Sequence, residues 1–366
     1  MRFNPASFSE YDHHERVVDL ADLDPKLAGY IAIHSTRPGP AIGGTRAMAY
    51  ESTEAAVADA LRLSKTMTFK CAISGLRFGG GKGVLIIDPK REDFREILKR
   101  YAHAVDTLKG TFYTGEDVGL SEADVQWMLQ YSQYFVGHTG QAGDPSQFAS
   151  LSVLKTLEVA LRHVFGDADF AGRRFSVKGA GKTGSELVRL LSERGAKVWV
   201  ADYDLDRVQE LVARFPGVRA AEVAESHRLP VDVYCPCALG GDLTLEIVPQ
   251  IQAKIIAGTA NNPIAEPAVS QLLYEKGILL VPDFIANAGG LINVADELLQ
   301  GGYNRERVIS GIEELKRTLD QVLRRSEQLH RPPDRIALDM AQHVIGLQKK
   351  AEPRGRPVKT RVESAV

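Results

Sequence analysis

Residues 174–184, RFSVKGAGKTG, decide the fold of the second half of this chain. The strand-like run RFSV leads into Gly179, Gly181 and Gly184, which have G-x-G-x-x-G spacing at the start of a helical pattern. Glycines so spaced permit a tight turn and a close backbone approach, and the helix N-terminus presents unpaired N–H groups to a pyrophosphate. The stretch therefore predicts a dinucleotide-binding turn between a strand and a helix.

Asp202 supports this interpretation because it ends the next strand-like segment, 18 residues after Gly184. A carboxylate there accepts hydrogen bonds from a ribose 2′-hydroxyl and repels a 2′-phosphate, which favours NAD over NADP. The alternative is an ordinary glycine turn followed by a surface aspartate. The residues that we expect to bind NAD are Gly179, Ala180, Gly181, Lys182, Thr183, Gly184 and Asp202.

Strand-like and helical segments alternate after the turn, which predicts a parallel sheet covered on both faces. The first half resembles an α+β unit, with strands at 31–34 and 84–87 and helices at about 52–66 and 91–108. We therefore expect an α/β protein with an N-terminal α/β domain and a Rossmann-type, doubly wound NAD-binding domain. The first is expected at residues 1–145 with about 325–350, where a long helical stretch returns to it, and the second at 146–324. Residues 351–366 read as a flexible tail.

Composition excludes several classes of function. The chain has 366 residues, 44% hydrophobic and 25% charged, which suits two domains. With a net charge of −2, the chain lacks the excess of basic residues that is typical of nucleic-acid-binding proteins. The N-terminus lacks the apolar stretch of a secretory signal, and no apolar run is long enough to span a membrane. Three cysteines, Cys71, Cys235 and Cys237, are expected to be buried structural residues of a cytoplasmic protein without a metal.

Three polar residues stand out in the first half. Lys82 follows three glycines, Lys70 lies in the otherwise apolar MTFKCAI, and Asp117 lies in TGEDVG. Singly, Lys82 reads as a solvated charge and Asp117 as a turn or cap residue, whereas a lysine among apolar neighbours needs a partner. Together they suit an α-amino acid. One ammonium binds the carboxylate, a buried amine beside another positive charge acts as a base, and a carboxylate relays protons.

Seven motifs follow one another along the chain in this order: GPAIGGTR, MTFK, GGGKGV, GEDVG, CPCALGG, AGTANN and PDFIANAGGLINVADEL. This series, from about Ile31 to Arg307, resembles the leucine, phenylalanine and valine dehydrogenases of the Glu/Leu/Phe/Val dehydrogenase superfamily. The resemblance implies NAD-dependent oxidative deamination of an apolar L-amino acid to a 2-oxo acid and ammonium. It also implies a homo-oligomer, in which the first domain binds substrate and mediates oligomerisation, and a cleft between the domains.

The resemblance also implies roles for single residues. Lys70 would bind the substrate carboxylate, Lys82 would be the base that activates the water attacking the imine, and Asp117 would assist proton transfer. Further substrate contacts are implied at Gly43, Gly44, Asn261 and Asn262. Further cofactor contacts are implied at Cys237, Ala238, Asn261 and Asn287.

Substrate preference is expected from four positions. Glutamate-specific relatives carry a lysine in P-x-K-G-G, where this chain has Ile42, and an unpaired carboxylate buried there would cost several kcal/mol. Val294 stands where those relatives bear a small hydroxyl, and with Leu291 it predicts an apolar pocket, plain core packing being the alternative. By resemblance, leucine-type enzymes have T-A-E-D where this chain has T-G-E-D, with Gly115 in place of the alanine. The missing methyl group predicts a larger pocket and an aromatic or broad range of substrates.

One departure concerns the cofactor, because Ala149 stands where the family usually has a threonine near the nicotinamide. Either Ser150 replaces the missing hydroxyl or cofactor binding is weaker. Two other functions compete. A 2-hydroxy-acid dehydrogenase would rely on a histidine–carboxylate pair and an arginine, where this chain presents lysines. A non-catalytic NAD-binding regulator on the same scaffold is disfavoured by the joint presence of Lys70, Lys82 and Asp117.

Overall fold

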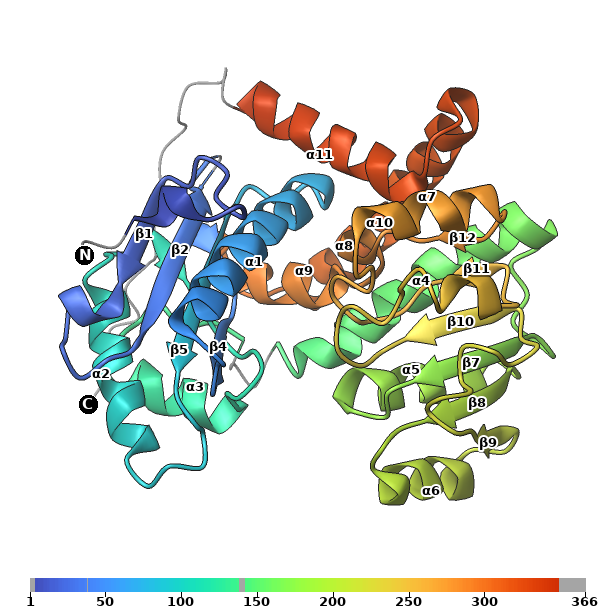
Figure 1. Ribbon diagram of the computed structural model, residues 1–366, viewed down its shortest axis with the longest axis horizontal. Coiled ribbons are helices and arrows are strands. Elements are labelled where there is room, and N and C mark those ends of the chain that lie inside the picture. Colours follow the sequence, from blue (N-terminus) through green and yellow to red (C-terminus); the bar gives the residue numbers. More distant parts are fainter. Residues whose placement is uncertain (1–3, 38, 138–141, 349–366) are drawn as a thin grey trace. The chain divides into compact units, whose positions relative to one another are not determined.

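The computed structural model describes residues 4–37, 39–137 and 142–348, which fold into two α/β units (Figure 1). The first unit comprises the chain up to Asp144, Asn293–Arg305 and the chain from Ala341 onward. The second comprises Pro145–Ile292 and Glu306–Met340. The α/β class predicted from the sequence is confirmed. The predicted tail at 351–366 lies outside the described residues.

The first unit is a mixed sheet between helices. Its strands are β1 (Arg16–Asp19), β2 (Gly29–Ser35), β3 (Ala41–Ile42), β4 (Thr45–Met48), β5 (Gly79–Ile86) and β6 (Phe112–Tyr113). Its main helices are α1 (Thr53–Ile73), α2 (Phe94–Asp106) and α3 (Glu122–Leu129). The strand order is β1-β2-β5-β3-β6, with β4 also pairing with β5. The pairs β1–β2 and β2–β5 are antiparallel, whereas β3 and β4 pair with β5, and β6 with β3, in parallel.

Two cores cover the two faces of this sheet, since side chains alternate along a strand. On one face α1 packs over β2 and β5 (Figure 1), burying Ala56, Val57, Ala60 and Leu61 with Tyr30, Ala32 and Val84. On the other face α2 and α3 bury Leu98, Tyr101, Val125 and Met128 with Ile31, Ile33, Ala47 and Leu85. Residues two apart on β5, such as Lys82 and Val84, therefore share the α1 face.

The second unit contains a six-stranded sheet. Its strands are β7 (Arg174–Lys178), β8 (Lys197–Ala201), β9 (Val218–Ala220), β10 (Val233–Pro236), β11 (Ile255–Ile256) and β12 (Leu279–Leu280). The helices of this half of the chain are α4 (Pro145–Phe165), α5 (Lys182–Ser192), α6 (Leu205–Arg214), α7 (Pro267–Glu275), α8 (Asp283–Ala286), α9 (Gly289–Asp296), α10 (Arg305–Leu329) and α11 (Pro333–Gln348).

All neighbouring strands of this sheet are parallel, in the order β12-β11-β10-β7-β8-β9. Taken in chain order from β7, this is the 3-2-1-4-5-6 arrangement of a Rossmann fold, so the predicted doubly wound sheet is confirmed. The strand order reverses between β7 and β10. In such sheets a ligand binds at the carboxyl ends of the strands beside this switch point. The chain leaves β7 at Gly179 and leaves β10 at Cys237.

The C-terminal segment predicted to return to the first domain, about 325–350, rejoins the first unit at Ala341. Residues Asn293–Arg305 belong to the first unit, whereas α10 belongs almost entirely to the second. Helix α10 packs beside α4, as the ion pairs Lys316–Glu158 at 2.7 Å and Lys155–Glu313 at 2.5 Å show. Amphipathic spacing shows that a helix has an apolar face but not what it packs against. Strand β9 was not predicted.

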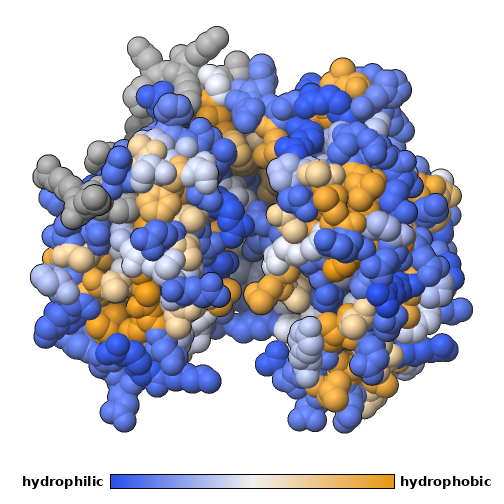
Figure 2. Space-filling view, viewed as in Figure 1, coloured by the Kyte–Doolittle hydropathy of each residue, from blue (hydrophilic) through white to orange (hydrophobic). Residues whose placement is uncertain are grey.

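The face of the molecule drawn in Figure 2 is mostly hydrophilic, with separate apolar patches on each unit. Among the described residues, no helix is both long enough and apolar enough to cross a membrane.

Candidate active site

Lys82 lies inside strand β5, on the face covered by α1. Its side chain is only 5% exposed. The glycines before it also belong to β5, where a Cβ at Gly79, Gly80 or Gly81 would meet neighbouring atoms at less than 3 Å. The glycine run thus lets three chain segments approach one another closely around the strand that carries Lys82.

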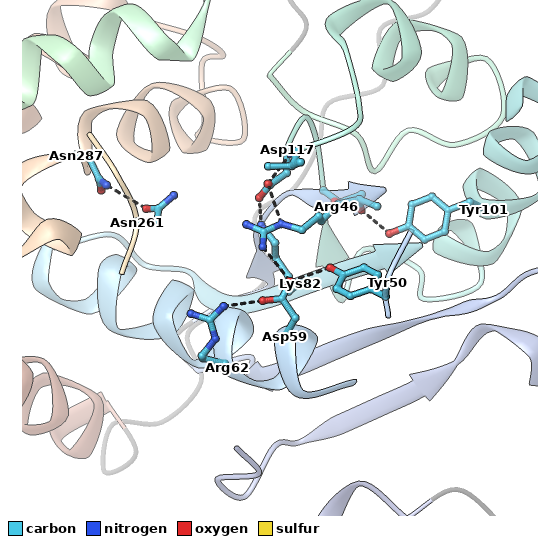
Figure 3. A network of polar contacts seen from close by, with 12 residues as sticks. Arg46, Tyr50, Asp59, Arg62, Lys82, Tyr101, Asp117, Asn261 and Asn287 are labelled. Atoms are coloured by element: carbon cyan, nitrogen blue, oxygen red, sulfur yellow. Dashed lines mark hydrogen bonds and ion pairs between the residues drawn. The ribbon is translucent and has the colours of Figure 1, made fainter. Parts of the chain in front are cut away.

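Lys82 Nζ donates a hydrogen bond to Asp117 Oδ2 in a direct ion pair (Figure 3). Two residues far apart in the sequence therefore meet as the sequence analysis expected of a base and its relay. Asp117 is held in place locally, because its Oδ1 accepts a hydrogen bond of 2.6 Å from the Val118 N–H. This hydrogen bond within the loop orients the Asp117 carboxylate toward Lys82.

Asp117 is ionised in this setting. Burial opposes ionisation, but the charges of Lys82 and Arg46, together with the hydrogen bonds from Lys82 and Val118, outweigh it and hold the pKa of Asp117 well below its usual range. An ionised carboxylate in contact with an ammonium can accept and return a proton without leaving the site. The pair can therefore move protons between itself and a bound molecule.

The segment Gly43–Gly44, between β3 and β4, lies against the same site. A Cβ at Gly43 would stand 1.9 Å from the carbonyl oxygen of Gly81. A Cβ at Gly44 would stand 2.6 Å from the carbonyl oxygen of Glu116 and 3.0 Å from Asp117 Cβ. Only glycine fits these two positions without displacing the strand that leads to Lys82 or the loop that carries Asp117.

Lys70 is buried near the end of α1, the helix that covers Lys82. It does not lie in a separate strand or loop, because α1 continues through MTFKCAI to Ile73 and ends at Ser74 and Gly75, whose φ of +70° suits glycine at a helix terminus. Of the three expected polar residues, Lys82 and Asp117 are thus in direct contact, and Lys70 lies on the helix that packs over the strand of Lys82.

Residues of the expected apolar pocket are placed in part. Ile42 is fully buried in β3, opposite Gly80 and Tyr113 in the neighbouring strands. Val294 lies 3.4 Å from where a Cβ would stand on Gly137, within the first unit. Leu291 also lies in α9 but is assigned to the second unit. No contact among Ile42, Leu291 and Val294 is established within the described residues.

The expectation for Gly115 was wrong in its physical reason. A Cβ at this position would stand 2.4 Å from the carbonyl oxygen of Val136. The missing methyl group therefore faces backbone rather than open space, and its absence does not enlarge a pocket.

The dinucleotide turn has the geometry that its glycines predict. Gly179 has a φ of +111°, and a Cβ there would stand 2.8 Å from the Ala238 nitrogen. A Cβ at Gly184 would stand 1.9 Å from the Gly179 carbonyl oxygen, so this glycine lets α5 pack onto the turn. A Cβ at Gly181 would meet nothing within 4 Å, which leaves open space at the N-terminus of α5, beginning at Lys182.

Asp202 follows β8 and binds the turn directly. Its Oδ2 accepts a hydrogen bond of 2.5 Å from the Ala180 N–H, and its Oδ1 accepts one of 2.9 Å from Asp204. Each oxygen keeps a lone pair, so the carboxylate can still accept from a ribose hydroxyl. On the other side of the turn, Cys237 is buried and its N–H donates to the Lys178 carbonyl at 2.7 Å.

A group of amides and hydroxyls follows β11. Thr259 donates to the Thr183 hydroxyl at 2.8 Å, which ties this segment to the start of α5. Asn287 Nδ2 donates to the Thr259 carbonyl and to Asn261 Oδ1, each at 3.0 Å (Figure 3). Asn262 holds a φ of +49°, and its N–H donates to Asp283.

Asn287 Oδ1 is buried and has no hydrogen-bond partner within the described chain. An orphaned buried acceptor of this kind calls for a donor from a bound molecule. The open space at Gly181 and the free lone pairs of Asp202 lie in the same unit. These features fit a nicotinamide dinucleotide, whose amide would supply a donor.

Of the two alternatives left open at Ala149, replacement by Ser150 is disfavoured by the partners of the Ser150 hydroxyl. Ser150 is fully buried, and its hydroxyl hydrogen bonds to the carbonyl oxygens of Thr183 at 2.7 Å and Ser146 at 3.0 Å. A hydroxyl has one proton to donate, and here backbone carbonyls take it. Ser150 holds α4 to α5 instead.

All three cysteines are free and buried, as the sequence predicts. Burial raises the pKa of the Cys71 thiol to about 12, so this group stays a neutral core residue.

The sequence analysis missed Arg46, Tyr50 and Asp59. Asp59 accepts hydrogen bonds from Arg46 at 2.9 Å and Tyr50 at 2.8 Å, and Arg46 also reaches Asp117 (Figure 3). The available signal was the position of Arg46, which directly follows GGT and lies on a strand whose other face is buried. An acidic residue in the following helix reads as solvated surface unless the pairing is known.

A Rossmann unit with a fitted dinucleotide turn, and a separate unit with a buried lysine–carboxylate pair, define a pyridine-nucleotide-dependent dehydrogenase. Two family models match the chain: the Glu/Leu/Phe/Val dehydrogenase dimerisation domain over residues 15–134, and the Glutamate/Leucine/Phenylalanine/Valine dehydrogenase domain over residues 200–351. The chain belongs to the Glu/Leu/Phe/Val dehydrogenase family.

Individual relatives cover nearly the whole chain. Leucine dehydrogenase of Geobacillus stearothermophilus is 38% identical over 93% of each chain. Valine dehydrogenase of Streptomyces albus is 39% identical over 95% of each chain. The crystal structure of L-tryptophan dehydrogenase from Nostoc punctiforme superposes with a TM-score of 0.78 at 36% identity, covering 92% of this chain and 97% of that one.

Proposed function

We propose that this protein is an NAD-dependent dehydrogenase that oxidatively deaminates an apolar L-amino acid, reversibly, to the 2-oxo acid and ammonium. The observation that carries the proposal is the buried Lys82–Asp117 ion pair in the first unit of a chain that also contains a dinucleotide turn. Relatives named leucine, valine and tryptophan dehydrogenases support the class of substrate.

The chain's own residues divide the work. The ammonium of Lys70 binds the substrate carboxylate, and the backbone of Gly43 and Gly44 bounds the substrate beside Asp117. A bound nicotinamide dinucleotide supplies the acceptor for the hydride that leaves Cα. Lys82 takes a proton from the water that attacks the resulting imine carbon, and Asp117 accepts and returns protons during collapse to the 2-oxo acid.

Lys82 in the described state donates its proton to Asp117. To act as a base it has to release one proton to solvent before or during substrate binding. Deamination should therefore be faster at alkaline pH.

Ile42 supports an apolar side chain in the substrate. The residue is fully buried, and its place in β3 directly precedes Gly43 and Gly44. A substrate carboxylate brought beside this side chain would lose its hydration without gaining a partner. Val294, which lies in the same unit as Ile42, is proposed to belong to the same pocket.

The cofactor is held by the turn Gly179–Gly184, by Asp202 and by the segment Cys237–Ala238, with Asn261, Asn262 and Asn287 at the nicotinamide end. NAD is proposed over NADP because the carboxylate of Asp202 repels a 2′-phosphate. Without a hydroxyl at Ala149, cofactor affinity rests on the remaining contacts.

We also infer a cytoplasmic homo-oligomer built through the first unit. The match of residues 15–134 to a dimerisation domain supports the assembly, and the free, buried cysteines suit a reducing compartment. Light scattering on the purified protein should give at least twice the monomer mass, and a monomer would contradict the inference.

A panel of L-amino acids tests the proposed function. The purified enzyme should form NADH, measured at 340 nm and alkaline pH, with leucine, valine, phenylalanine or tryptophan, and not with glutamate. A preference for glutamate would contradict the pocket. Binding of NAD without oxidation of any amino acid would favour the non-catalytic regulator, and oxidation of 2-hydroxy acids would favour the other class of dehydrogenase.

A further inference from the structure

Arg46 joins three parts of the first unit that carry the proposed chemistry. It lies on β4, opposite Val84 of β5, and therefore on the face of the sheet covered by α1. Its Nε donates to Asp117 Oδ1 at 3.4 Å, and its Nη1 donates to Asp59 Oδ2 at 2.9 Å (Figure 3). One guanidinium thus spans the loop that holds Asp117 and the helix that holds Lys70.

The neighbouring residue shows that this orientation follows from strand geometry. Thr45 points to the opposite face, where its hydroxyl lies 2.5 Å from the Tyr101 hydroxyl and 2.7 Å from that of Thr114. Alternation along β4 then directs Arg46 to the α1 face. The strand itself is fixed by its pairing with β5, so the guanidinium has little freedom to turn away.

The far end of the contact is also fixed. Asp59 receives hydrogen bonds from Tyr50 at 2.8 Å and from Arg62 at 2.7 Å, besides that from Arg46. Its side chain is only 11% exposed. With three donors on one carboxylate, Asp59 is a firm anchor on α1, and Arg46 extends from this anchor to Asp117.

We propose that Arg46 is a positioning residue for the deamination site, which holds the carboxylate of Asp117 against Lys82 by bridging it to Asp59 on α1. The proposal rests on the proposed function, because it assigns Arg46 through the roles of Lys82 and Asp117. Arg46 touches neither substrate nor cofactor in this assignment.

The charges around Arg46 agree with this arrangement. Burial opposes its positive charge, but the carboxylates of Asp117 and Asp59 outweigh burial and raise the pKa of Arg46. Burial and the hydrogen bond to Asp59 raise the pKa of Tyr50, which stays neutral. The charged groups that ion pairs link around Arg46 are thus Lys82 and Arg62 with Asp117 and Asp59, and the buried Lys70 lies further along α1.

Arg46 also sets how readily the Lys82–Asp117 pair gives up a proton. The guanidinium is a second positive charge on the same carboxylate. Removing it takes away a positive charge that disfavours the protonated form of the pair, so that the pair holds its proton more tightly. Since a charge within about 4–6 Å shifts a titration by roughly 1–3 pH units, the effect is measurable.

The pH profile of kcat/KM tests the proposal. In Arg46→Gln the ascending limb should move to higher pH by roughly one unit, with kcat at pH 8 reduced about tenfold. Arg46→Lys should restore the position of the limb in large part, because it returns the charge. Arg62→Gln is the matched control, since it removes a partner of Asp59 that does not touch Asp117, and it should leave the limb in place.

Two outcomes would overturn the proposal. A uniform loss of activity in Arg46→Gln with an unmoved limb would mean that Arg46 only stabilises the fold. An equal movement of the limb in Arg62→Gln would mean that the charge of α1, rather than the contact with Asp117, matters.

A stability cycle separates this proposal from the proposed function. The melting temperatures of Arg46→Gln, Asp117→Asn and the double variant should be non-additive, because the two side chains are in contact. If the wild-type enzyme oxidises no amino acid but the cycle is non-additive, the proposed function fails and the bridge stands. Additive melting temperatures would overturn the bridge itself.

Discussion

At the scale of single residues, Asp202 carries the cofactor preference. Asp202→Asn removes the charge that repels a 2′-phosphate but keeps a side-chain oxygen for the Ala180 N–H. Two unit charges about 4 Å apart interact by roughly 1–4 kcal/mol near a protein surface. The ratio of kcat/KM for NADP to that for NAD should therefore rise at least about tenfold.

The control for this variant is Asp204→Asn. Asp204 lies two residues further on and pairs with Arg207 at 3.0 Å. It should leave the ratio unchanged. A wild-type preference for NADP, or an unchanged ratio in Asp202→Asn, would argue against the assignment of Asp202.

Single residues were predictable where their type is restricted by chemistry. The buried lysine Lys82 and its carboxylate partner Asp117 were expected together, and the structure places them in contact. Arg46 was not, because an arginine on a half-buried strand is read as surface until its partners are known. The partners of Ser150 were not predictable either, since the sequence does not show that backbone carbonyls take its proton.

At the scale of elements, the segment Gly43–Gly44 between β3 and β4 packs closely against both β5 and the loop that carries Asp117. Gly44→Ala would place a Cβ 2.6 Å from the Glu116 carbonyl and 3.0 Å from Asp117 Cβ. The loop would have to move, and misplacement by about 1 Å costs on the order of 10²-fold in rate. The kcat of this variant should fall by about that factor in steady-state assays.

The matched substitution is Gly346→Ala, in helix α11, where a Cβ meets nothing within 4 Å. This variant should keep the wild-type kcat. Wild-type turnover in Gly44→Ala would show that the close approach of the two segments does not position Asp117.

Element boundaries were less predictable than element types. Periodicity ended the first long helix near residue 66, whereas α1 runs to Ile73 and brings Lys70 onto the helix. The residues MTFKCAI contain neither glycine nor proline, so nothing stops the helix before Gly75. The next strand was likewise predicted to begin at residue 84, whereas β5 begins at Gly79, because close neighbours, not flexibility, require the glycines there.

At the scale of the whole molecule, the doubly wound parallel sheet was predictable from the alternation of strands and helices around the glycine turn. The path of the C-terminal third was not. It enters the first unit at Asn293–Arg305, returns to the second for α10, and rejoins the first at Ala341. Helix α10 has an apolar face and a charged face, and the charged face pairs with α4. This pattern in the sequence would be the same whichever unit the helix packed against.

The central claim is that Lys82 activates water in an oxidative deamination, and release of ammonium measures it most directly. With NAD and the best apolar amino acid, the wild-type enzyme should release one ammonium for each NADH formed. In Lys82→Ala both rates should fall about 10²–10⁴-fold. The fold should persist, because Arg46 still pairs with Asp117. Ammonium release near the wild-type rate in a folded Lys82→Ala enzyme, or NADH formed without ammonium, would contradict the account.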